Sequence, residues 1–347
     1  MEKDFKVLKT IGSQNTEIGV AQTVVRNLKS NDFFIVEMGA YKKGEIAAIC
    51  RIVNPKVGII TGVNIQHLEL FGSLENIMKA KFELILSIQK GGVIIFNYDN
   101  KLVRQMVEWT KKRRPDLKMI FCITNKSKVL ELRKKEWETV LATNQVIQPH
   151  FLSFDMEFKN KTRTVHTNLS GVQNIPNILL ASGASLYLGL SFDRIVGLIR
   201  SIKSADKTMK IISQEKKMTV IDDTFNANPD GVTAALDYMK IYKGKKILVM
   251  TPLIELGEES RKVHNEFGRK AGKICDKIIL TNNNFYSDIN EGIKETGKKK
   301  LEIKVETDPN ILVNILKKDY DPKGIILFEG KEASKALELF DFPDKIL

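Results

Sequence analysis

Residues 57–83 constrain the fold of this chain more than any other stretch. The apolar run 57–63 predicts a buried strand, which leads into a polar segment ending at His67. Ser73 then suits the N-cap of a helix, and this places Lys81 two turns inside that helix. In open α/β sheets, ligands bind outside the carboxyl ends of the strands. The stretch therefore predicts an α/β fold with His67 at the ligand-binding edge of a sheet.

Two further apolar runs, 33–36 and 93–96, also end in polar clusters, and Glu37 directly follows the first. Because these strand ends are expected at the same edge, we expect Glu37, His67 and Lys81 to come together there. A carboxylate oxygen suits a hard cation and a lysine suits phosphate charge, so the three residues predict a magnesium and phosphate site. The alternative is that they are the polar strand ends that any α/β protein carries.

The order of these residues resembles the central domain of the Mur ligases. The resemblance rests on five short runs, which are Glu37-Met38-Gly39, Gly44-Glu45-Ile46, Asn64-Ile65-Gln66-His67-Leu68-Glu69, Phe71-Gly72-Ser73 and Lys79-Ala80-Lys81. It implies that Glu37 and His67 bind Mg²⁺. It also implies that CO₂ carbamoylates Lys81, so that Lys81 serves the metal site as an anion and acts in catalysis together with His67.

A loop at residues 11–19 precedes a helix that we expect over residues 20–28. In the Mur ligases the matching loop lies near the UDP-sugar substrate, so the resemblance implies that Asn15 and Thr16 bind substrate. Glycine and asparagine also favour turns, and without the resemblance a simple turn is the preferred interpretation.

Residues 171–177 resemble the family's adenine-binding run, in which two asparagines hydrogen-bond the base. Asn174 and Asn177 match those asparagines, while Gln173 replaces a histidine. Paired amide donors and acceptors suit the edge of a purine, but both asparagines would serve equally well as helix caps.

Residues 222–229 read Asp-Asp-Thr-Phe-Asn-Ala-Asn-Pro and resemble a second run of the family, from which only the phenylalanine departs. The resemblance implies that Asp223 binds the ribose of ATP and that Asn226 and Asn228 face its phosphates. A capped turn between a strand and a helix would explain one aspartate and one asparagine, but not all eight residues.

Four departures bear on activity. The family's glycine-rich phosphate loop, GxxGK[ST], and its N-terminal UDP-binding domain precede the position of Met1, so we expect this chain to lack both. A partner protein on a separate chain could then supply the phosphate loop. Thr208 stands where the family usually has an arginine that meets the nucleotide, and Glu329 stands where it often has a lysine.

A polar, lysine-rich segment at residues 201–210 marks the expected domain boundary. Residues 1–205 are expected to form the Mur ligase central domain, with a mostly parallel sheet and without its phosphate loop. Residues 206–347 are expected to form a smaller, Rossmann-like C-terminal α/β domain. Alternating residues between 151 and 169 predict a hairpin within the first domain.

The charge and composition exclude several classes of protein. The net charge of +13 is spread along the chain without interleaved aromatic residues, so we predict no nucleic-acid partner. No apolar run approaches the roughly 20 residues that a membrane helix needs, and the N-terminus has no signal-peptide pattern, so we predict a cytoplasmic protein without a membrane partner. The three cysteines are far apart and are expected to be reduced core thiols.

The resemblance implies an ATP- and Mg²⁺-dependent amide ligase of peptidoglycan precursor synthesis. The most similar member of the family joins D-alanyl-D-alanine to a UDP-muramoyl-peptide, the UDP-N-acetylmuramoyl-tripeptide, through an acyl phosphate. The alternative is a truncated, non-catalytic relative that binds a nucleotide, a UDP-sugar or a partner protein.

Overall fold

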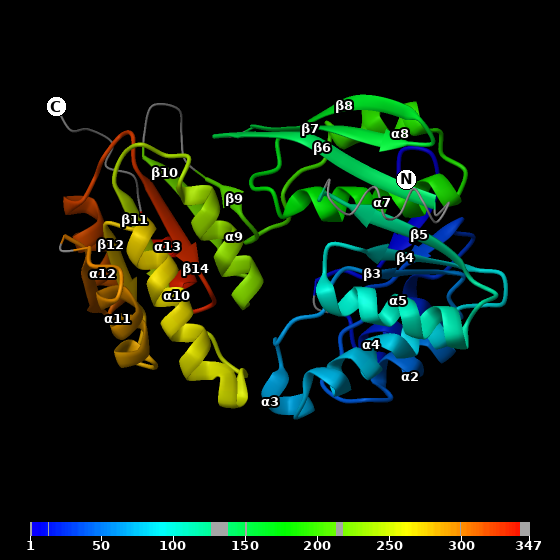
Figure 1. The fold of residues 1–347 in the computed structure, drawn as a ribbon, viewed down its shortest axis with the longest axis horizontal. Helices are drawn as coiled ribbons and strands as arrows, with labels where there is room; N and C mark the ends of the chain where they lie inside the picture. The colour runs from blue at the N-terminus through cyan, green and yellow to red at the C-terminus, as the bar shows by residue number, and fades with distance from the viewer. Residues whose placement is uncertain are drawn as a thin grey trace. The chain divides into compact units, whose positions relative to one another are not determined.

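The computed structural model describes residues 2–12, 14–125, 138–149, 151–212, 218–298 and 300–340. The chain divides into two compact units and contains two six-stranded sheets, of which one lies mainly in the first unit and the other in the second (Figure 1). The first unit comprises residues 1–144, 154–165 and 175–199, and the second comprises residues 145–153, 166–174 and 200–347. The predicted α/β fold is confirmed in both units.

The sheet of the first unit has the strand order β3-β4-β5-β6-β7-β8, and β3 to β6 pair in parallel. Its strands are β3 (Val57–Ile60), β4 (Val93–Asn97), β5 (Lys118–Ile123), β6 (Glu138–Gln148), β7 (Phe151–Phe158) and β8 (Lys161–Thr167). The neighbouring strands β7 and β8 confirm the predicted hairpin. A separate parallel pair is formed by β1 (Val7–Lys9) and β2 (Phe33–Ile35).

Both faces of this sheet are covered, because side chains alternate along each strand. Ile94 and Phe96 of β4 face the cluster formed with α4 (Leu74–Ser87) and α5 (Lys101–Arg113). Ile95 of the same strand faces Gly183 of α7 (Asn174–Tyr187). Figure 1 shows α7 on the opposite side of the strands from α4 and α5. The remaining helices of this unit are α1 (Glu17–Asn27), α2 (Glu45–Val53), α3 (Leu68–Phe71) and α8 (Phe192–Ile199).

The sheet of the second unit has the order β13-β12-β11-β14-β10-β9, with only β9 antiparallel. Its strands are β9 (Lys210–Ile211), β10 (Thr219–Asp223), β11 (Lys246–Met250), β12 (Lys277–Leu280), β13 (Glu302–Val305) and β14 (Ile325–Glu329). The helices are α9 (Pro229–Met239), α10 (Ser260–Ile274), α11 (Tyr286–Lys294), α12 (Pro309–Lys318) and α13 (Ala333–Leu339), with a 3₁₀ turn η1 (Gly257–Glu259). Side chains of α12 and α13 pack on one face of this sheet.

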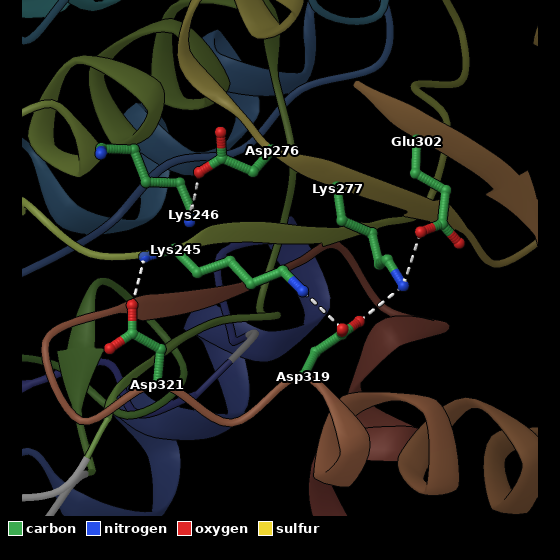
Figure 2. Close-up of polar contacts among 7 residues, drawn as sticks. All are labelled: Lys245, Lys246, Asp276, Lys277, Glu302, Asp319 and Asp321. Carbon is green, nitrogen blue, oxygen red and sulfur yellow. Dashed lines mark hydrogen bonds and ion pairs between the residues drawn. The ribbon is translucent and has the colours of Figure 1, made fainter. Parts of the chain in front are cut away.

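An ion-pair network closes the amino ends of the strands in the second unit (Figure 2). The carboxylate of Asp319 lies between two ammonium groups, at 2.5 Å from Lys245 Nζ and 2.5 Å from Lys277 Nζ. Lys277 is buried and also pairs with Glu302 at 2.8 Å. Because ligands bind at the opposite edge of such sheets, we assign this network to stability.

Two contacts fix α10 against its surroundings. Its buried His264 accepts a hydrogen bond from the backbone N–H of Leu253 through Nε2 (3.0 Å) and lies 2.7 Å from the carbonyl of Ser260 through Nδ1. These partners require the neutral ring, and burial lowers the pKa of His264. A Cβ atom at Gly292 of α11 would overlap the carbonyl oxygen of Asn265, so the two helices touch through a glycine.

The three cysteines are free and buried, as predicted. Among the described residues, no helix is both long and apolar enough to cross a membrane.

Candidate functional site

Glu37, just past the end of β2, is held by Asn15 from the loop that precedes α1. The side-chain amide of Asn15 donates to Glu37 Oε1 at 3.1 Å, and the Asn15 carbonyl accepts from the N–H of Gly39 at 2.8 Å. The residue predicted for substrate and the residue predicted for metal are therefore neighbours. Thr16 caps α1 by accepting from the N–H of Gly19 at 3.3 Å.

His67 lies beyond the end of β3 and immediately before the short helix α3. Its backbone is left-handed, with φ of 63°, and its carbonyl accepts from the N–H groups of Leu70 and Phe71. The imidazole is half-buried and meets the ring of Tyr41 edge-on, with 5.1 Å between the ring centroids. Tyr41 belongs to the loop that follows Glu37, so this loop connects the two predicted metal ligands.

Lys81 lies on α4, whose N-cap is Ser73, as predicted from the sequence. Its side chain is half-buried, and burial lowers the pKa of its ammonium group. Within the described parts of the chain, we find neither a hydrogen bond nor an ion pair to this side chain. Among the described residues, the Lys81 ammonium group is therefore left without a neutralising carboxylate.

Glu83, which lies two residues after Lys81 on α4, was not identified from the sequence. Its carboxylate accepts from the N–H of Gly44 at 2.6 Å and from the N–H of Ala47 at 3.0 Å, at the start of α2. Its closeness to Lys81 in the sequence was the available signal for a role at this site. Its hydrogen-bond partners, however, lie 39 and 36 residues away in the sequence.

The donors of this first site suit a hard cation only in part. Glu37 offers carboxylate oxygen and His67 offers imidazole nitrogen, whereas an ammonium group at Lys81 would repel a metal. Over the residues that the structure describes, no group of three or more His, Cys, Asp or Glu side chains is placed to hold a metal ion. The fit therefore depends on the chemical form of Lys81.

The predicted adenine residues lie one turn apart at the start of α7. The side-chain amide of Asn174 donates to the carbonyl of Ser170 at 2.7 Å, while Asn177 is exposed. Gln173, which replaces the expected histidine, packs against Gly171. Asn174 is thus partly committed to the backbone, and Asn177 is accessible.

The run 222–229 connects β10 to α9 in the second unit. Asp223 Oδ1 accepts from the backbone N–H of Met209 at 3.0 Å. Asn228 caps α9 by accepting from the N–H of Gly231 at 3.0 Å, and Asn226 is exposed. The helix cap therefore accounts for Asn228 but not for Asn226, which remains available to a ligand.

Asp223 faces Glu329, its direct neighbour across the parallel strands β10 and β14. Both carboxyl groups are buried, at 7% and 1% exposure, which makes them a close pair of acids inside the protein. Burial raises the pKa of Asp223 to about 6, and burial together with the Asp223 charge raises the pKa of Glu329 well above its usual range. The proton of the pair therefore resides on Glu329.

Comparison with known proteins finds family matches for two stretches of the chain. Residues 1–185 match the family described as "Mur ligase middle domain", and residues 209–332 match "Mur ligase, glutamate ligase domain". The UDP-N-acetylmuramoyl-tripeptide--D-alanyl-D-alanine ligase of Buchnera aphidicola is 29% identical over 306 residues, which cover 87% of this chain and 64% of that protein. The enzyme of the same name from Bacillus subtilis is 25% identical over 339 residues, covering 96% and 69%.

Solved structures agree on the fold. The MurF ligase of Thermotoga maritima in complex with ADP superimposes with a TM-score of 0.82 at 23% identity, covering 98% of this chain and 74% of that one. A crystal structure of MurF from Acinetobacter baumannii gives a TM-score of 0.81 at 24% identity, covering 98% and 70%. The chain spans about two thirds of the length of these relatives, and 64% of the Buchnera protein.

Proposed function

The chain belongs to the Mur ligase family, and from this premise we propose that it acts as an ATP-dependent amide ligase in peptidoglycan precursor synthesis. The proposed reaction joins D-alanyl-D-alanine to UDP-N-acetylmuramoyl-tripeptide, as the names of its relatives describe for those proteins. Residues 1–205 would form the central domain and residues 206–347 the C-terminal domain.

The hydrogen bond between Asn15 and Glu37 is the observation that carries this proposal. It joins the loop proposed to lie near the UDP-sugar to the carboxylate proposed to hold magnesium. A reaction between a substrate carboxylate and ATP needs these two functions at one place, because the two anions must approach each other. Thr16 supports the same loop as the cap of α1.

Magnesium, when bound, would neutralise charge on the phosphates and on the substrate carboxylate. Glu37 and His67 would hold it, together with Lys81 in its carbamoylated form. The half-buried Lys81, whose pKa is lowered by burial, supports carbamoylation, since only the neutral amine reacts with CO₂. The carbamate would remove the repulsive ammonium charge and supply oxygen ligands.

The nucleotide would be held by residues of the runs 171–177 and 222–229. Asn174 and Asn177 offer amide groups to adenine, and Asn177 is exposed as this role requires. Asp223 would meet the ribose as a carboxylate above its pKa of about 6, and Asn226 and Asn228 would face the phosphates.

In the proposed reaction, the peptide carboxylate attacks the γ-phosphate of ATP and releases ADP. The amine of the dipeptide then attacks the resulting acyl phosphate, and phosphate leaves as the amide bond forms. The residues named above bind and orient the reactants, which lowers the entropic part of the barrier.

Two substitutions favour a second candidate function. Thr208 is exposed and uncharged where the family usually has a nucleotide-binding arginine, and Glu329 is buried with Asp223 where the family often has a lysine. A chain that has lost these cations would bind a nucleotide, a UDP-sugar or a partner protein without ligation.

A product assay separates the two functions. The chain is incubated with Mg-ATP, bicarbonate, UDP-N-acetylmuramoyl-tripeptide and D-alanyl-D-alanine, and mass spectrometry detects the new amide. We expect product from the wild type, none from Lys81→Ala, and undiminished product from Lys79→Ala, an exposed lysine on the same helix that pairs with Glu75. Product that survives in Lys81→Ala would contradict the proposed site, and a wild type that binds ATP without forming product would favour the second function.

A further inference from the structure

Helix α2 has no side-chain cap of its own. Its N-cap residue is Gly44, with φ of 94°, a conformation that glycine adopts without strain. The N–H groups at such a helix start need acceptors, and here the carboxylate of Glu83 supplies them from α4 at 2.6 and 3.0 Å. A carboxylate bonded to two N–H groups at the positive end of a helix makes strong, charge-assisted hydrogen bonds.

The segment 38–44, between Glu37 and α2, touches every element that carries a candidate metal ligand. Gly39 at its start is bonded to Asn15, which also holds Glu37. Tyr41 at its centre meets the His67 ring. The end of the segment is bonded to α4, on which Lys81 lies, through Glu83.

This segment is also bonded to the first residue of α2. The N–H of Tyr41 donates to Glu45 Oε2 at 2.7 Å, and the N–H of Lys42 donates to the same oxygen at 3.2 Å. A displacement at Gly44 would therefore be transmitted to Tyr41 and to the imidazole beside it. Because Glu83 and Lys81 lie two residues apart on α4, the hydrogen bonds of Glu83 hold the part of α4 that carries Lys81 beside the end of this segment.

We propose that Glu83 is a positioning residue of the metal site. It ties segment 38–44 to α4 and so keeps Glu37, His67 and Lys81 in fixed positions relative to one another. Glu83 contacts neither metal nor substrate in this role. The inference rests on the proposed function for the identity of the metal, while the tie itself rests on the two hydrogen bonds.

Metal binding tests the proposal without requiring turnover. Mn²⁺ alone serves as a paramagnetic probe for the magnesium site, and free Mn²⁺ is counted by electron paramagnetic resonance in bicarbonate buffer. Loss of a residue that orients ligands typically weakens metal affinity by 10–100-fold, so we expect a loss of about that size in Glu83→Ala. Glu83→Gln keeps one carbonyl oxygen as an acceptor, and we expect it to recover part of the affinity.

Ser73→Ala is the matched control, because it removes a cap from the same helix without touching segment 38–44. A purely structural role for Glu83 predicts that both variants lower the melting temperature and that folded Glu83→Ala binds Mn²⁺ as the wild type does. The positioning role predicts weakened binding in Glu83→Ala only. Equal affinity in wild type and Glu83→Ala would overturn the proposal.

Hydrogen exchange distinguishes this failure from a failure of the proposed function. Glu83→Ala should speed amide exchange in segment 38–44, including Tyr41 and Lys42, and Ser73→Ala should leave it unchanged. If the wild type binds no Mn²⁺ but the two variants show these exchange rates, the metal site is contradicted and the tie between Glu83 and segment 38–44 is retained. Unchanged exchange in Glu83→Ala would overturn the tie itself.

Discussion

Replacement of Asp223 by asparagine should make the protein less sensitive to rising pH. Burial raises the pKa of Asp223 from 3.8 to about 6, so the folded state binds this proton more tightly than the unfolded state. The resulting stabilisation is fully present below pH 3.8 and is lost as the pH rises through about 6. This rise in pKa corresponds to about 3 kcal/mol in the free energy of unfolding.

Asparagine keeps an Oδ1 acceptor for the N–H of Met209 but has no proton to lose. The free energy of unfolding of Asp223→Asn, minus that of the wild type, should therefore increase by about 3 kcal/mol between roughly pH 4 and pH 7. Urea unfolding followed by circular dichroism measures both proteins across this range. His264 has the opposite effect on the pH dependence of stability, but it is present in both proteins and cancels in the difference.

Glu329→Gln is the matched control for this pair of acids. The glutamine amide can donate the hydrogen bond that protonated Glu329 donates to Asp223, and Asp223 still titrates in this variant. Glutamine also removes the separate contribution of Glu329, whose own pKa is raised, so the variant should keep the part of the wild-type pH dependence that comes from Asp223. A difference between Asp223→Asn and wild type that stays constant with pH would refute the reasoning. So would a Glu329→Gln variant that abolishes the dependence while Asp223→Asn preserves it.

Three further predictions concern stability. Asp319→Ala should lower the free energy of unfolding by about 3–5 kcal/mol, measured by urea unfolding, because it leaves buried Lys277 without its closest partner. The double variant that adds Lys277→Met should recover part of this loss. Acid below about pH 6.5 should destabilise the wild type more than His264→Asn, since the folded state resists protonation of a ring whose pKa is lowered; equal acid sensitivity in thermal melts would contradict this. Gly292→Ala should cost about 1–3 kcal/mol or more through overlap with Asn265, while Gly197→Ala, in the open on α8, should be neutral or slightly stabilising; chemical denaturation of both variants would expose the error if their order were reversed.

The sequence was most informative where a local signal determines the structure. The Ser73 cap and the apolar strand before His67 are short-range patterns, and both were found as predicted. The hairpin at residues 151–169 followed in the same way from its alternating side chains. Strand β13 carries no such signal, because it is a short edge strand whose few apolar residues are interrupted by Lys304.

Contacts between distant elements were beyond the reach of sequence patterns. Glu329 was noticed only as a departure from a family run, because its position opposite Asp223 depends on the register of two parallel strands. Glu83 reaches Gly44 only after α2 packs against α4. The roles predicted for Asn15, Asn174 and Asn226 remain predictions, since each depends on a ligand.

Calorimetric titration of Mg-ATP into the purified chain tests the central proposal most directly, beside His67→Ala for the metal site and Asp223→Ala for the ribose. We predict micromolar binding by the wild type, weakened by each substitution, in variants whose circular dichroism spectra match the wild type. Absence of heat in the wild type, or equal affinity in all three proteins, would contradict the proposed nucleotide and metal site.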